Sequence, residues 1–168
     1  MTGGRDGVRR RIRRRRGDPR RVPQQVRDGP RGRAHPAGPD AVHRHQIPGR
    51  IRAISTHTLG RDGDPLDALV TVGEPTFPGC VILCRAIGMY CMRDEKGPDE
   101  KILCVPAHDP RYVDVQDIDD VPEFDRMEIT HFFDVYKDLE PGKSVEGSHW
   151  EGRDQAYAEI AASRARAR

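Results

Sequence analysis

Lysine, glutamate, leucine, cysteine and all aromatic residues are absent from the first 55 positions of this 168-residue chain. The same segment carries 16 arginines and four aspartates, a net charge of +12, whereas positions 56–168 carry 23 acidic and 13 basic side chains, a net charge of −10. A segment without leucine or aromatic residues cannot bury enough apolar surface to offset its chain entropy. We therefore predict that residues 1–55 are disordered and that residues 56–168 form the folded domain.

Long hydrophobic runs are also absent. No stretch reaches the 18 or so apolar residues that a membrane span requires, and the N-terminus lacks the apolar core of a secretory signal. The four cysteines, at positions 80, 84, 91 and 104, include no pair with the two-residue spacing of a zinc knuckle. We expect a cytoplasmic protein with no membrane contact, whose cysteines are buried free thiols.

Positions 56–168 contain apolar segments of two kinds. Three short runs, at residues 67–72, 80–92 and 101–106, read as buried strands. Residues 122–139 space their apolar side chains by three and four, as in an amphipathic helix, and the alanine-rich residues 154–165 predict a second helix. The fold class is therefore α+β, with too few strands to close a barrel unless residues 1–55 contribute some.

An acidic turn precedes the first of these strands. Asp62, Asp64 and Asp67 fall within six residues, which is enough negative charge to favour a bound cation. A calcium-binding EF-hand loop is excluded, because its sixth position would be Asp67 instead of glycine and its twelfth would be Gly73 instead of glutamate. The alternative is an ordinary solvated turn, since Asp-Gly and Asp-Pro are common turn formers.

A second acidic loop joins the next two predicted strands. It contains Asp94, Glu95, Asp99 and Glu100, with Lys101 beside them. If the strands pair as a hairpin, Asp94 and Asp99 lie near each other at its mouth. Carboxylates from both loops could then surround Mg²⁺, which prefers oxygen ligands and retains several waters. A solubilising loop is again the alternative.

Three stretches in order, DGDPLDA at 62–68, MRDEKGPDEK at 92–101 and HFFDVYKDLEPGK at 131–143, resemble the soluble (family I) inorganic pyrophosphatases. The resemblance covers about residues 56–163. It implies a small β-barrel with flanking helices, Mg²⁺-dependent hydrolysis of pyrophosphate to two phosphates, and a homo-oligomer, commonly a hexamer. It implies no membrane and no specific nucleic acid partner.

The same resemblance implies roles for individual residues. The metal ligands would be Asp62, Asp67, Asp94 and Asp99. The catalytic residues would be Asp64, which positions or deprotonates the attacking water, and Asp99. The phosphate oxygens would be held by Lys101, Tyr136 and Lys137. These roles suit a reaction that needs charge neutralisation and an in-line hydroxide.

Residues 1–55 do not match this family. Its N-terminal third should supply barrel strands, a metal-binding glutamate, a lysine and glutamate close together, an arginine, and two tyrosines in a YPxxYG-like stretch. The segment could instead be a basic arm for nucleic acid, a targeting peptide or an out-of-frame translation. An arm selected for nucleic acid would mix lysine and aromatic residues with its arginines.

Codon arithmetic favours the out-of-frame interpretation. Residues 24–29 (QQVRDG) can be written CAA CAA GTA CGA GAT GGA, which one base later reads NKYEM, similar to the family's NKYE segment. Residues 34–53 can likewise be encoded so that the shifted frame reads HIRLDRTLFTATRYPAEYG, which resembles the strand with the arginine and the two-tyrosine stretch. We therefore expect the first barrel strands to be missing or disordered and the activity to be impaired. The alternative function is a catalytically inactive acidic domain with a basic, polyanion-binding arm.

Overall fold

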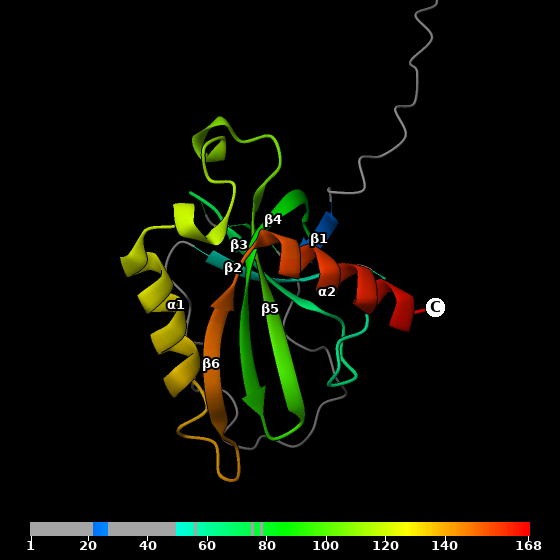
Figure 1. Ribbon diagram of the computed structural model, residues 1–168, viewed down its shortest axis with the longest axis vertical. Coiled ribbons are helices and arrows are strands. Elements are labelled where there is room, and N and C mark those ends of the chain that lie inside the picture. The colour runs from blue at the N-terminus through cyan, green and yellow to red at the C-terminus, as the bar shows by residue number, and fades with distance from the viewer. Residues whose placement is uncertain (1–21, 27–49, 56, 75, 78) are drawn as a thin grey trace, which may run out of the picture.

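The computed structural model describes residues 22–26, 50–55, 57–74, 76–77 and 79–168, and among them it forms one mixed sheet with two long helices (Figure 1). The strands are β1 Val22–Val26, β2 Arg50–Ser55, β3 Asp67–Thr71, β4 Val81–Asp94, β5 Gly97–Pro106 and β6 Val145–Glu151. The sheet order is β1-β2-β3-β5-β4-β6, and β1 also pairs with β4. The first five strands therefore close into a ring, to which β6 adds along β4.

Two of these strands, β1 and β2, come from the arginine-rich segment. β1 pairs antiparallel with β2 and β4, and β2 pairs antiparallel with β3. The expectation that residues 1–55 are disordered is therefore wrong for these two stretches. Strand pairing uses backbone groups, which every non-proline residue offers regardless of its side chain. The remainder of that prediction falls on residues outside those the structure describes.

The long strand β4 holds the sheet together because it pairs with three neighbours. It lies beside β1 at its start, beside β5 along its length and beside β6 over its second half. A register irregularity between Ala86 and Gly88 bends it. A side chain at Gly88 would approach the carbonyl oxygen of Glu151 to 3.1 Å, so glycine permits β6 to pack closely there.

The helices cover opposite faces of the sheet. α1 spans Glu123–Val135 and α2 spans Arg153–Arg166. Leu69 packs in the apolar cluster that includes the α1 residues, whereas its neighbours Ala68 and Val70 pack in the cluster that includes the α2 residues. This alternation is the period of two expected of a strand buried on both faces. Two short 3₁₀ helices, Pro110–Tyr112 and Ile118–Asp120, lead into α1.

The elements predicted within residues 56–168 agree with the structure apart from their ends, and one strand of that part, β6, was missed. The helix predicted at residues 122–139 ends at Val135 in the structure, and residues 136–139 form a turn. The strand β6 was not predicted because its sequence, VEGSHWE, is largely exposed and lacks apolar alternation. Among the described residues, no helix combines the length and apolar character needed to cross a membrane.

Substitution of the buried residue Phe133 tests how α1 packs on the sheet. Its ring stacks on that of Tyr90, with centroids 5.4 Å apart. We predict that Phe133→Ala lowers the free energy of unfolding by about 3–5 kcal/mol, through lost burial and the resulting cavity. Urea denaturation measures this change. Phe124→Ala in the same helix, where the ring is 68% exposed, should change stability by no more than about 0.5 kcal/mol, and equal effects of the two substitutions would contradict this packing.

Candidate active site

The acidic turn between β2 and β3 is fixed at its base by buried hydrogen bonds. The Thr58 hydroxyl donates to the Ser55 carbonyl at 2.7 Å and accepts the Leu66 N–H at 3.1 Å. Gly63 adopts a φ of 86°, which glycine tolerates without strain. The turn therefore presents its carboxylates from a fixed position at the start of β3.

The second acidic loop is a tight hairpin. β4 ends at Asp94 and β5 begins at Gly97, and the register places Met92 opposite Asp99. Gly97 has a φ of 125°, a conformation that L side chains rarely adopt. On its other side β5 runs parallel to β3, with Asp67 paired to Lys101. This parallel pairing, which was not predicted from the sequence, brings the two acidic segments to one end of the sheet.

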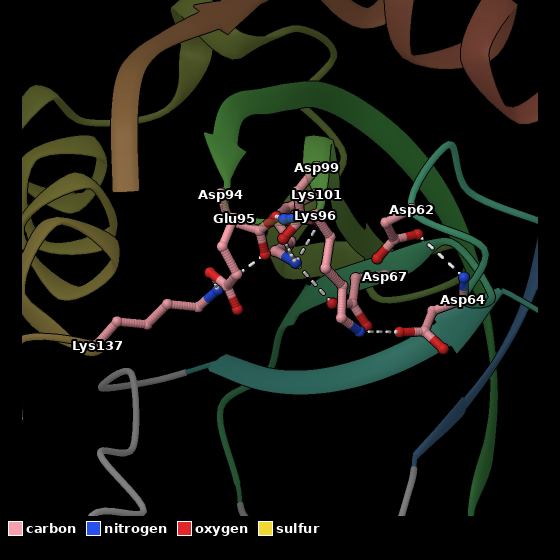
Figure 2. Close-up of polar contacts among 9 residues, drawn as sticks. All are labelled: Asp62, Asp64, Asp67, Asp94, Glu95, Lys96, Asp99, Lys101 and Lys137. Carbon is pink, nitrogen blue, oxygen red and sulfur yellow. Dashed lines mark hydrogen bonds and ion pairs between the residues drawn. The ribbon is translucent and has the colours of Figure 1, made fainter. Parts of the chain in front are cut away.

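Lys101 lies between carboxylates from the two segments (Figure 2). Its Nζ is 2.7 Å from Asp67 Oδ2 and 2.6 Å from Asp99 Oδ1. The three side chains are only 3%, 13% and 10% exposed, respectively. Burial raises the pKa of Asp99 despite the attraction of Lys101, and the charges of Asp67 and Asp94 raise it further. This part of the site thus concentrates more negative charge than one ammonium balances.

A second lysine binds the hairpin from α1's C-terminal end. Lys137 Nζ lies 2.8 Å from Asp94 Oδ2 and 2.8 Å from Glu95 Oε2. Burial opposes ionisation of Asp94, but hydrogen bonds from Lys137 and from the Lys96 backbone outweigh it and hold its pKa below the usual value. The ring of Tyr136 lies beside this ammonium, with its centroid 5.5 Å from Nζ.

The outer edge of the site is solvent-exposed. Asp64 pairs with Lys96 at 3.1 Å, and both side chains are more than half exposed. The backbone N–H of Asp64 donates to Asp62 Oδ1 at 3.1 Å, which turns the Asp62 carboxylate back over the loop. Lys96 was not among the predicted site residues. Its position could have indicated it, because it is a lysine within the turn of the acidic hairpin.

A small cleft opens between the two acidic segments. It is lined by Gly60, Asp62, Pro65, Leu66, Asp67, Asp99 and Glu100. Asp62, Asp67 and Asp99, three of the four predicted metal ligands, thus share one cleft, while Asp94 is held beside it by Lys137. Glu95 and Glu100 add further carboxylates, for which no functional role was predicted from the sequence. The roles of the individual side chains remain predictions.

Two acidic loops on a closed sheet, with buried lysines among their carboxylates, bring together the side-chain types that suit divalent cations and anionic ligands. Residues 53–168 match the family model described as inorganic pyrophosphatase. The chain belongs to the inorganic pyrophosphatase family.

Individual relatives agree with this assignment. The chain is 68% identical to an inorganic pyrophosphatase of Streptomyces coelicolor over 104 residues, which are 62% of this chain and 64% of the relative. It is 56% identical to that of Corynebacterium glutamicum over 103 residues, 61% and 63% of the two chains. The matched segment thus spans less than two thirds of either curated relative.

Solved structures match more of the chain. The crystal structure of inorganic pyrophosphatase from Thermus thermophilus is 39% identical and covers 90% of this chain and 94% of its own, with a TM-score of 0.74. The inorganic pyrophosphatase from Helicobacter pylori is 36% identical, with a TM-score of 0.68 and 71% of each chain covered. The similarity confirms the α+β barrel with flanking helices.

The buried position of Lys101 predicts how stability changes when its ammonium is replaced by an uncharged side chain. Lys101→Met leaves Asp67 and Asp99 buried together without their cation, and we expect it to lower the free energy of unfolding by about 3–5 kcal/mol in the presence of a chelator. Added Mg²⁺ should restore more stability to this variant than it adds to the unsubstituted chain, because a divalent ion can replace the missing charge.

The matched control is Lys96→Met, which removes an exposed ion pair and should have little effect on urea denaturation. If Lys101→Met were as mild as Lys96→Met under chelation, the two carboxylates would not depend on the buried ammonium.

Proposed function

We propose that this chain hydrolyses inorganic pyrophosphate to two phosphates in a Mg²⁺-dependent reaction. The observation that carries the proposal is the convergence of Asp67 and Asp99, from separate segments, on the single ammonium of Lys101. The neighbouring donors are carboxylate oxygens, which suit a hard cation such as Mg²⁺. Bound Mg²⁺ would neutralise phosphate charge and acidify a bound water.

We assign each residue of the site a role that suits its charge and its exposure to solvent. Asp62, Asp67, Asp94 and Asp99 would hold the metal ions. Asp64, on the exposed edge, would orient the attacking water and accept its proton, and Asp99 would take part in catalysis from the buried side. The side chains of Lys101, Lys137 and Tyr136 would bind phosphate oxygens by charge and hydrogen bonding. Such a site favours direct attack by water on phosphorus, with no covalent enzyme intermediate.

The substitution Asp62→Asn tests the metal-binding role with little disturbance of the fold. The asparagine oxygen can still accept the Asp64 backbone N–H, but the negative charge is lost. In a protein whose residues 1–55 are replaced by the translation of the shifted frame, we expect phosphate release from pyrophosphate to fall at least about a hundredfold and its half-saturating Mg²⁺ concentration to rise. Asp119→Asn, whose side chain is 94% exposed, is the control. Equal activity of the two variants would remove Asp62 from the site.

We propose further that residues 1–55 are an out-of-frame translation and that the activity of this chain is impaired for that reason. The segment contains no lysine or tyrosine, and its arginines do not lie in a stretch that matches the family, so the family's phosphate-binding groups have no counterpart there. Each such contact is worth roughly 2–4 kcal/mol in the transition state, so losing several removes many orders of magnitude.

The test is to restore the shifted frame over the codons for residues 1–55. We expect the restored protein to release phosphate faster by several orders of magnitude per mole of soluble protein. Equal rates would show that the arginine-rich segment replaces the missing groups. No Mg²⁺-dependent release from either version would favour the alternative function, an inactive acidic domain with a polyanion-binding arm.

We propose a cytoplasmic homo-oligomer, a hexamer by the family resemblance, with pyrophosphate as its substrate and with no membrane or specific nucleic acid partner. Sedimentation of the restored protein gives its mass directly. A monomer at micromolar concentration would contradict the proposed assembly.

A further inference from the structure

A second group of potential metal ligands lies on β4 and β6, which run side by side in Figure 1. The strands pair antiparallel, with Cys91 opposite His149 and Met89 opposite Glu151. The Cys91 Sγ, a ring nitrogen of His149 and a carboxylate oxygen of Glu151 all lie within 4.8 Å of one another. Residues directly and diagonally opposite on one sheet face are close enough for their side chains to meet.

This group lies on the other face of the sheet from Lys101 and Asp99, which are opposite Tyr90 and Met92. Cys91 packs against the apolar cluster that includes the α2 residues, whereas its neighbours Tyr90 and Met92 belong to the cluster on the α1 face. On β5, Glu100 also lies opposite Cys91, but its carboxylate pairs with Arg61 at 3.5 Å. Cys91, His149 and Glu151 therefore form a group that does not include the carboxylate of Glu100.

The chemistry of the three donors differs from that of the acidic loops. Thiolate, imidazole and carboxylate together are typical ligands of Zn²⁺, and Mg²⁺ does not favour sulfur. The His149 and Glu151 side chains are 63% and 36% exposed, so an ion can reach them from solvent. Burial raises the pKa of the Cys91 thiol to about 12, and the nearby carboxylates of Glu151 and Glu100 add to this effect. The same negative potential favours a cation.

We propose that Cys91, His149 and Glu151 form a binding site for Zn²⁺ or a similar transition-metal ion, with water completing a four-coordinate shell. On binding, the thiol loses its proton to solvent as the metal–sulfur bond forms, and neutral imidazole and carboxylate complete the protein ligands. The two negative ligands balance the charge of the ion. The register of β4 and β6 becomes irregular immediately after Cys91. A bound ion would therefore fasten the edge strand β6 to β4 beside that irregularity.

Cobalt(II) is the probe, because a cobalt–thiolate bond has a charge-transfer absorption that oxygen ligands do not produce. The full chain is titrated with Co²⁺ in excess Mg²⁺, so that the carboxylate site is occupied by Mg²⁺. We expect one equivalent of Co²⁺ to produce the thiolate band, and Zn²⁺ to abolish it by displacement. Cys91→Ser should lose the band, and His149→Ala or Glu151→Gln should weaken Co²⁺ binding at least about tenfold.

Cys80→Ser is the matched control, since Cys80 is also partly exposed and should leave the titration unchanged. Loss of the band in Cys80→Ser would place the sulfur ligand elsewhere and overturn the proposal. An absent band in the unsubstituted chain would overturn it, as would a band unchanged in both His149→Ala and Glu151→Gln. Circular dichroism of each variant separates a lost ligand from a lost fold. Because the readout is cobalt absorption, the result is independent of pyrophosphate hydrolysis.

Discussion

The parallel pairing of β3 with β5 is the constraint on which the site depends. It places Asp67 beside Lys101 in register and thereby joins the acidic turn before β3 to the hairpin that opens β5. The Lys101 ammonium then contacts carboxylates from both segments, at 2.7 Å and 2.6 Å. Because only 3% of its side chain is exposed, this lysine would become a buried, unpaired charge if it lost its carboxylate partners.

That arrangement links the stability of the barrel to its chemistry. The buried carboxylates repel one another: burial is the main cause of the raised pKa of Asp99, Lys101 opposes it, and the charges of Asp67 and Asp94 raise the pKa further. A divalent cation relieves this repulsion, so metal binding and folding should support each other. The exposed pair of Asp64 and Lys96 carries little of this energy. Asp64 can consequently exchange Lys96 for a water molecule at little energetic cost, as its proposed role requires.

The two acidic loops could be predicted from the sequence because each is determined by residues close to it along the chain. Turn-forming Asp-Gly and Asp-Pro pairs predicted the first acidic turn. The charged loop between two buried strands predicted that Asp94 and Asp99 lie near each other if those strands form a hairpin, and β4 and β5 do pair in this way. The partners of the carboxylates were harder to predict. The contact of Lys137 with Asp94 joins residues 43 positions apart and depends on how α1 packs on the sheet. Periodicity places a side chain on a helix face but does not specify which distant group it meets.

The arginine-rich segment shows the opposite failure, since its composition predicted disorder where β1 and β2 pair with the sheet. The closing of the barrel needs a backbone of suitable length beside the free edges of β3 and β4. Almost any sequence with some β-branched residues, such as Val22 and Ile51, can provide that backbone. A catalytic site makes the stricter demand, because an ammonium, a guanidinium or a phenol must lie at one position. Under the out-of-frame proposal, strand pairing can therefore survive a change of every side chain while the phosphate-binding groups are lost, and fold and activity become separable in this one segment.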